Sequence, residues 1–270
     1  MRTRPAIAVA VVIGLLGGTA GGAAEARSHH VVPHASTTIT VWLKRHGQLW
    51  HTKRVVSPAL PVRTAVRALF AGPNSAESAA RVKTAVPAGV PVLGTSLAHG
   101  VATVNLGTKF ASPAPRKRIR MRLAQLTFTV TQVPHVRAVH LEFHGSAVAS
   151  IGGVAVPNHM RRAHFRRLMP AIVVHSPVIG AHLSPGFRVT GTSDVFEGAM
   201  GLELLNAAGH RLAGIDFLAT CGTGCRGHFA VTVSYHVMNT QNGTLVVSDT
   251  SARGGHPPPH IVRIPVRLSP

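Results

Sequence analysis

Three side chains that could bind a metal ion stand at alternate positions in a short apolar run. His140, Glu142 and His144 are separated by Leu141 and Phe143. An extended strand would place all three on one face, because successive side chains of a strand point to opposite faces. Imidazole and carboxylate groups are ligands that zinc accepts, although a further neighbouring ligand would strengthen such a site. We favour the alternative, a solvated polar face on a half-exposed sheet, and predict no metal and no cofactor.

The chain has only two cysteines, Cys221 and Cys225, which flank a Gly-Thr-Gly turn. In an oxidising compartment such a pair most often forms a disulfide, which here would close a small loop between strands. A metal site would require two further soft ligands, and none is apparent nearby in the sequence. We therefore predict a disulfide between these two residues.

Carboxylates that could serve as a general acid and base are scarce. The first half of the chain after residue 26 holds only Glu77 and Glu142, which are far apart in sequence. In the second half Asp194 and Glu197 are the nearest pair, and we interpret them as ordering a turn beside Phe196. No G-x-S-x-G, H-E-x-x-H or Walker pattern is present. The sequence therefore predicts a protein that is not an enzyme.

Five cationic side chains gather within one short stretch, and we treat them as a candidate polyanion-binding edge: Arg116, Lys117, Arg118, Arg120 and Arg122. The stretch belongs to the charged half of a strongly basic chain with a net charge of +20. Residues 27–170 carry 20 Lys and Arg against two Glu, a net charge of +18, whereas residues 171–270 carry six Arg against five acids, a net charge of +1. Such a field attracts nucleic acid, anionic lipid or anionic wall polymers. The alternative is a solvated face in a generally basic protein.

The first residues indicate export. Two arginines precede a short apolar run at 7–16, and the A-x-A triplet at 24–26 fits a cleavage site, so residues 1–26 form a predicted signal peptide. An uncleaved N-terminal membrane anchor stays open as the alternative. Residues 27–37 are predicted to be a flexible leader. We therefore expect a secreted or extracytoplasmic protein of the cell envelope.

Export and composition together reduce the number of partner classes to consider. Nucleic-acid binders usually interleave basic residues with stacking aromatics, but aromatic residues make up only 4% of this chain. Trp42 and Trp50 lie on predicted strands, where we expect them to pack. We therefore expect envelope proteins and anionic wall or lipid polymers as partners rather than nucleic acid, and self-assembly stays open.

The hydrophobic pattern changes near residue 170 and divides the chain into two modules. Before it, alternation and helical spacing predict strand, helix, hairpin, helix and strand, at 38–43 with 48–56, 62–70, 92–97 with 101–106, 116–132 and 136–143. This order indicates an α+β or α/β layered domain with helices on one face of a small sheet. We set this domain at 38–155 and a basic linker at 156–170.

The second module is predicted to be all-β, at residues 171–270. Its short strands, separated by Gly, Pro and Asn turns, are expected at 172–174, 187–190, 200–205, 229–237, 245–247 and 262–268. Short strands at this spacing over about 100 residues are typical of an immunoglobulin-like sandwich.

The first module resembles the GerMN domain of sporulation and spore-germination proteins. The resemblance lies in an ordered set of segments: Thr64–Pro73, Thr84–Gly89, Gly100–Leu106, Arg122–Gln132, Val136, Val139 and Gly145. The second module resembles the immunoglobulin-like domain that follows GerMN in some germination proteins. Its matching residues are Ile172–Pro177, Ser184, Pro185, Val189–Gly191, Phe196, Glu197, Asn206, Gly209, Phe229, Pro265 and Val266.

These resemblances imply a non-catalytic binding or scaffold protein of the bacterial envelope, of the sporulation or germination type. They imply no enzyme activity and assign no catalytic residue. Proteins of this kind are often lipoproteins, but no cysteine follows the apolar run here to take a lipid. The alternatives are a secreted protein that binds a polyanion, either wall polymer or nucleic acid, and a cell-wall hydrolase.

Overall fold

The computed structural model describes residues 36–250 and 260–270. The predicted signal peptide and all but the end of the predicted leader lie outside these residues. The first strand begins at Thr37, the last residue assigned to the predicted leader, and Thr37 pairs with Val56.

The chain begins its described fold with a long antiparallel hairpin. Strand β1 (Thr37–Arg45) pairs with β2 (Gln48–Val56) along its whole length. His46 and Gly47 connect the strands with φ angles of 50° and 81°. Two consecutive left-handed residues match the right-handed twist of a hairpin, which explains the tight turn.

Two helices follow the hairpin. Helix α1 (Pro61–Phe70) begins with a proline in its first turn, where a missing N–H costs nothing, and buries one stripe of side chains. Helix α2 (Ser75–Ala79) was not predicted. It begins with a capping box, in which the Asn74 side chain accepts from the Glu77 N–H and Glu77 accepts from the Asn74 N–H.

A second sheet has the strand order β3-β4-β5-β6. Its strands are β3 (Val92–Ala98), β4 (Val101–Leu106), β5 (Ala138–Phe143) and β6 (Ser146–Ala147). The first two form the predicted hairpin, and β4 pairs in parallel with β5. A parallel pair requires a crossover connection, which runs through the 3₁₀ turn η1 (Thr108–Ala111) and helix α3 (Arg116–Val130).

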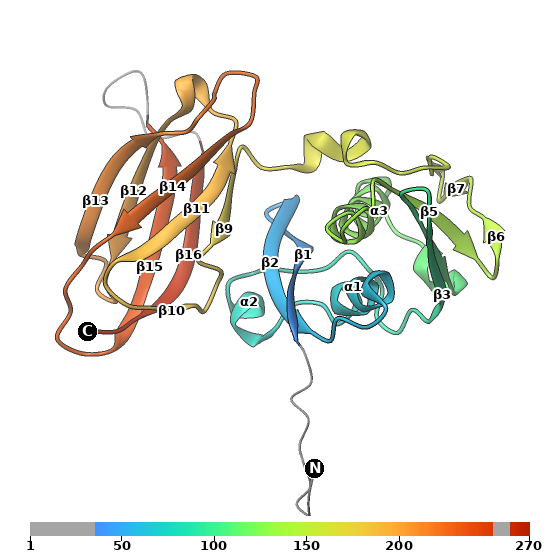
Figure 1. The fold of residues 1–270 in the computed structure, drawn as a ribbon, viewed down its shortest axis with the longest axis horizontal. Coiled ribbons are helices and arrows are strands. Elements are labelled where there is room, and N and C mark those ends of the chain that lie inside the picture. Colours follow the sequence, from blue (N-terminus) through green and yellow to red (C-terminus); the bar gives the residue numbers. More distant parts are fainter. Residues whose placement is uncertain (1–35, 251–259) are drawn as a thin grey trace, which may run out of the picture. The chain divides into compact units, whose positions relative to one another are not determined.

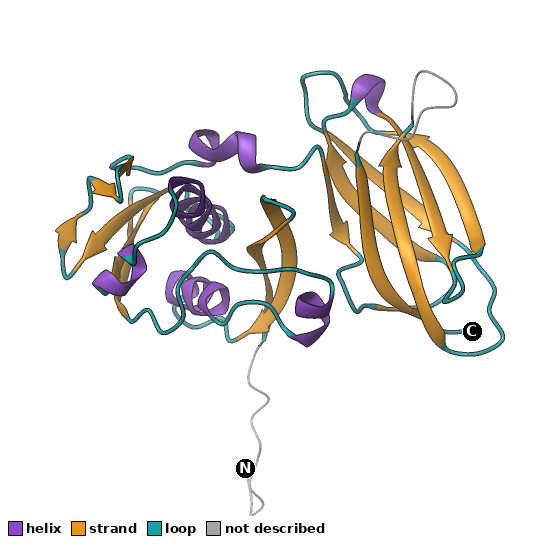
Figure 2. Cartoon of the chain, turned by 180° about the vertical axis from the view of Figure 1, so that it is seen from behind, coloured by secondary structure: helices purple, strands orange, loops and turns teal. Residues whose placement is uncertain are grey.

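The mixed α+β class of this module is confirmed, but the layering differs from the prediction. The β1–β2 hairpin forms a sheet of its own, and helices α1 and α3 pack between it and the second sheet (Figure 2). The helical spacing of Ile119, Leu123, Leu126 and Val130 predicts a single buried stripe on helix α3. Instead every residue from Met121 to Val130 is buried, because layers cover the helix on both sides.

The predicted basic linker is largely packed against this module. It follows the short strands β7 (Ser150–Ile151) and β8 (Val154–Ala155) and carries the 3₁₀ helix η2 (Arg162–Leu168). Met160 and Val139 exchange two backbone hydrogen bonds of 2.8 and 2.9 Å, and Met160 and Phe165 are buried. We call the elements from β1 to η2 the N-terminal module.

The C-terminal module, from β9 to β16, is the predicted sandwich of two sheets (Figure 1). One sheet has the order β14-β11-β9 and the other β10-β16-β15-β12-β13. The strands are β9 (Ile172–Ser176), β10 (His182–Leu183), β11 (Phe187–Ser193), β12 (Ala199–Leu205), β13 (Arg211–Leu218), β14 (Gly227–Val233), β15 (Gln241–Asp249) and β16 (Ile261–Leu268).

Two details of the sandwich differ from the sequence prediction. Strands β10 and β13 were missed, and β14 ends at Val233 rather than continuing to Val237. Beyond that strand the chain remains buried at Tyr235, whose hydroxyl donates to the Leu183 carbonyl at 2.5 Å. Tyr235 is buried and its hydroxyl has a hydrogen-bond partner, so the apolar alternation in the sequence continues beyond the end of β14.

Candidate functional site

The cations at the start of helix α3 are exposed. Arg116, Lys117 and Arg118 occupy its first turn, which holds no acidic residue. The N-terminus of a helix carries a partial positive charge, so cations there are unfavourable and an anion is favoured. In the part of the chain that the structure describes, none of the three forms an ion pair. They remain available to an external anion.

Arg120 is exposed but already partly used by the fold. Its guanidinium donates to the His164 carbonyl at 2.7 Å and lies 5.7 Å from the centre of the Phe165 ring. These contacts hold η2 against α3, so the side chain has a structural role besides its charge.

Arg122 does not belong to the exposed edge, and this corrects the sequence prediction. The residue is only 2% exposed. Its guanidinium donates to the carbonyls of Ala85 and Ser112, each at 3.1 Å, and to that of Phe110. A guanidinium that is enclosed and bonded in this way stabilises the fold and cannot reach a polymer.

The candidate metal ligands do not form a site. His140 and Glu142 lie on one face of β5 as predicted, with Nε2 and Oε1 3.6 Å apart. His144 lies beyond the end of the strand, in a turn where its φ is 50°. The other ring nitrogen of His140 is 2.9 Å from the Asn158 carbonyl. Across residues 36–250 and 260–270, no three His, Cys, Asp or Glu side chains are grouped to hold a metal ion.

The buried carboxylate of the N-terminal module has a structural partner. Glu77 accepts two hydrogen bonds from Arg54, at 2.6 and 2.8 Å, and one each from the Thr52 hydroxyl and the Asn74 N–H. Burial by itself would raise the pKa of Glu77, but these hydrogen bonds and the charge of Arg54 hold it below its usual range. Glu77 is therefore ionised and bound within the fold.

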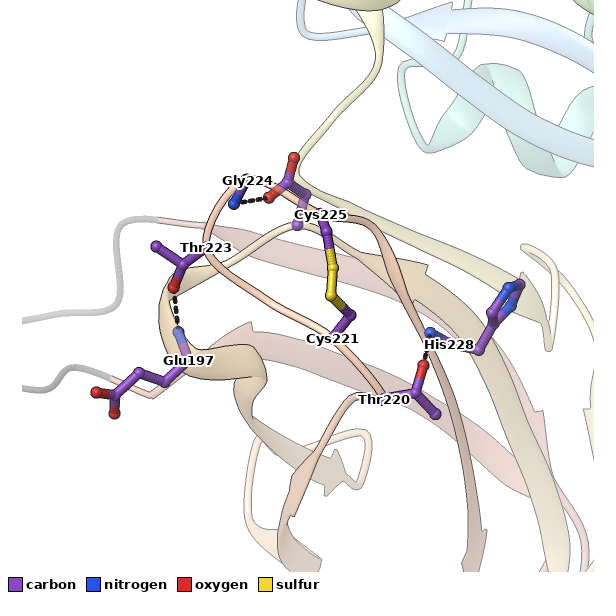
Figure 3. The surroundings of a disulfide bond; sticks show 8 residues. Glu197, Thr220, Cys221, Thr223, Gly224, Cys225 and His228 are labelled. Carbon is purple, nitrogen blue, oxygen red and sulfur yellow. Dashed lines mark hydrogen bonds between the residues drawn. A yellow bond between two sulfur atoms is a disulfide. The ribbon is translucent and has the colours of Figure 1, made fainter.

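The predicted disulfide between Cys221 and Cys225 is present (Figure 3). Its small loop is fixed at two further points. The Asp194 carboxylate accepts from the Gly224 N–H at 3.0 Å, and the Thr223 hydroxyl accepts from the Glu197 N–H at 2.9 Å. The Asp194 carboxylate therefore helps to order the disulfide loop, whereas Glu197 contributes its backbone N–H rather than its carboxylate.

Removing this disulfide by the double change of both cysteines to serine is expected to cost about 2 kcal/mol at most. The closed loop is very short, and loop-closure entropy grows with loop length. Urea unfolding of the oxidised parent and the double variant measures the difference. Asp194→Ala, which removes the bond to Gly224, serves as a comparison at about 1 kcal/mol. A loss above about 4 kcal/mol would show that the bridge supports much more than its own loop.

A cavity of about 570 Å³ lies at the end of the N-terminal module where β1 begins. Threonines, prolines and aliphatic side chains line it, and His135 is the one ionisable residue among them. General acid–base chemistry requires a second ionisable group within reach of the first, so this lining does not supply an acid–base pair.

None of the helices described in the structure is long and apolar enough to cross a membrane.

Two family models match the chain in succession. Residues 38–149 match the family described as sporulation and spore germination. Residues 171–256 match the family described as the immunoglobulin-like domain of bacterial spore germination. Among curated proteins, none matches this chain.

Three solved structures are similar at low identity. The first GerMN domain of the sporulation protein GerM from Bacillus subtilis is 16% identical, with a TM-score of 0.38, over 47% of this chain and 98% of that chain. The tandem GerMN domains of the same protein are 11% identical, with a TM-score of 0.41, over 73% of this chain and 61% of that chain. A proposed lipoprotein from Clostridium perfringens is 15% identical, with a TM-score of 0.37, over 50% of this chain and 93% of that chain.

The resemblances seen in the sequence are therefore confirmed by the family models: residues 38–149 are a GerMN domain of the sporulation and spore germination family, and residues 171–256 belong to the immunoglobulin-like family of bacterial spore germination.

Proposed function

We propose that this protein is a non-catalytic scaffold of the bacterial envelope, of the sporulation or germination type, which acts outside the cytoplasm. The immunoglobulin-like domain makes contacts with envelope proteins, and the basic N-terminal module holds the protein near anionic polymers. The order of the two germination-type domains supports the class of protein. The predicted signal peptide supports the location.

One observation carries the proposed role of the basic module: its positive charge has almost no internal counterion. Between residues 27 and 170 the only carboxylates are Glu77 and Glu142. The first is bound by Arg54, and the second lies 3.6 Å from the ring of His140. The remaining cations must be balanced from outside, and an anionic polymer does this with a gain in counterion entropy.

Neutralising four cations of α3 together is the test. The full-length chain carrying Arg116→Gln, Lys117→Gln, Arg118→Gln and Arg120→Gln is expressed in a bacterial host, and its envelope fraction is washed with rising salt. We expect this variant to leave the envelope at moderate salt, where the parent protein stays bound.

The matched control removes the same charge from the immunoglobulin-like domain, through glutamine at four exposed arginines: Arg188, Arg211, Arg263 and Arg267. Thermal unfolding of both variants checks that they are folded, since Arg120 also contacts η2. Unchanged retention of the α3 variant, or equal release of both variants, would contradict the proposed role of the α3 cations.

A further inference from the structure

The turn of the β1–β2 hairpin forms one wall of a small cationic pocket. The pocket has a volume of about 250 Å³. Its lining consists of Lys44, Arg45, His46, Gly47, Arg81 and Lys83. The lining contains no acidic side chain. Its ionisable groups are two lysines, two arginines and one histidine.

The backbone holds the two lysines of the pocket opposite each other. Lys44 and Lys83 exchange two hydrogen bonds of 2.9 Å between their main chains, as an isolated antiparallel bridge. Like charges directly opposite across such a pair repel each other. Arg81 stands two residues before Lys83 with a left-handed φ of 63°, which few residues other than glycine adopt. The fold therefore holds these cations together against their repulsion.

Lys44 is surrounded by positive charge. Burial lowers the pKa of Lys44, and the charges of Arg118 and Lys83 lower it further. In the described part of the chain, the ion pairs involve other cations, and none of Lys44, Arg81 and Lys83 is bound to a carboxylate.

Arg45 differs from the other cations of the pocket. Its guanidinium lies 4.7 Å from the centre of the Trp50 ring, a cation–π contact that orients the side chain along β2. Lys44, Arg81 and Lys83 are therefore the groups that can turn toward a ligand.

We propose that Lys44, Arg81 and Lys83 form a binding site for a phosphodiester group of an anionic polymer. Phosphate oxygens accept charge-assisted hydrogen bonds from several ammonium and guanidinium donors at once, which a recessed cluster of cations can supply. This inference rests on the proposed function and names the ligand chemistry of the basic module.

The surroundings of the pocket favour a polymer over a membrane surface. Segments that bind membranes combine cations with exposed large apolar side chains. In the described N-terminal module such side chains are Val55, Leu60, Leu93 and Leu97, and none of them lines this pocket. A nucleic acid would also gain from an exposed aromatic platform, but Trp42 is buried and Trp50 is covered by Arg45.

The test compares two double variants of the mature chain. Arg81→Gln with Lys83→Gln changes two exposed residues of the pocket, and Lys109→Gln with Arg137→Gln removes the same charge from exposed positions outside it. Titration calorimetry measures binding of inorganic phosphate and of soluble poly(glycerol phosphate). Phosphatidylglycerol vesicles and duplex DNA are tested in parallel.

We expect the pocket variant to lose about tenfold or more in affinity for both phosphate probes, the factor that loss of one charge-assisted hydrogen bond produces. The control variant should change by less than about twofold, as expected of general screening. Equal losses in both variants, or no phosphate binding by the parent, would overturn the site. Tighter binding to vesicles or DNA than to poly(glycerol phosphate) would overturn the polymer assignment. Envelope retention through α3 could still hold in either case, so the two proposals fail separately.

Discussion

Glu77→Gln is expected to lower the free energy of unfolding by about 3 kcal/mol, the scale of breaking a buried ion pair by removal of one partner. The Glu77 side chain is 2% exposed and that of Arg54 is 19% exposed, so the guanidinium would be left without its counterion in a place that water hardly reaches. The change also weakens the cap of α2, because the side chain accepts from the Asn74 N–H. Urea unfolding at neutral pH measures the loss.

Glu203→Gln is the matched control. Its partner Arg211 is 3.6 Å away, and the two side chains are 49% and 65% exposed, so the pair is expected to contribute less than about 0.5 kcal/mol. Equal losses in both variants would contradict the structural role assigned to Glu77.

The stability of the parent should also depend on pH through Glu77. Its pKa is lowered in the folded state, so the unfolded state takes up the proton first as pH falls. The stabilisation is complete above the ordinary glutamate pKa of about 4.3 and is lost as pH falls through the lower folded value. Glu77→Gln should show a smaller loss of stability over this acidic range, and an unchanged pH profile would contradict the assignment.

Arg122→Met is expected to lower the free energy of unfolding by about 3 kcal/mol, as much as Glu77→Gln. The substitution leaves the Ala85, Phe110 and Ser112 carbonyls without their shared donor, and a buried polar group without a partner costs about 1–3 kcal/mol. Methionine retains much of the volume, so loss of packing should be the smaller part of the effect.

Arg118→Met is the comparison for this second variant. It lies one turn earlier on α3 and is exposed, so its stability should change by less than about 0.5 kcal/mol. Binding to an anionic polymer should show the opposite order, with a loss for Arg118→Met and little change for folded Arg122→Met. A polymer-binding defect in Arg122→Met without loss of stability would contradict its placement in the core.

The sequence placed most strands correctly because alternation of apolar and polar residues reports a half-buried sheet. It failed where a segment is buried on all sides. Helix α3 carries Gln125, Thr127 and Thr129 in the core, although polar side chains usually mark the exposed face of a helix. The core tolerates them because their side chains have partners. Gln125, for example, donates to the Trp42 carbonyl at 3.0 Å and accepts from the Ala85 N–H at 2.7 Å.

The burial of Arg122 had a readable signal. It stands three residues after Ile119 and four before Leu126, on the stripe that faces the core. Arg122 was nevertheless interpreted as an exposed cation, because its charge was given more weight than its position on the helix. Helix α2 was equally readable from the Asn74-x-x-Glu77 capping box.

The cationic pocket had no such signal in the sequence. Lys44 and Lys83 come from segments far apart along the chain, and only the bridge between their backbones brings them together. Charge counting located the basic half of the protein, but the positions of the cations in space depend on the packing of the hairpin against the segment after α2.

The most direct test of the scaffold proposal is the salt concentration at which the parent protein and the α3 variant leave the envelope fraction, repeated with soluble competitors. We predict that the parent elutes at higher salt than the α3 variant and is displaced by poly(glycerol phosphate) more readily than by duplex DNA. Elution of both proteins at the same salt concentration, or preferential displacement by DNA, would contradict it.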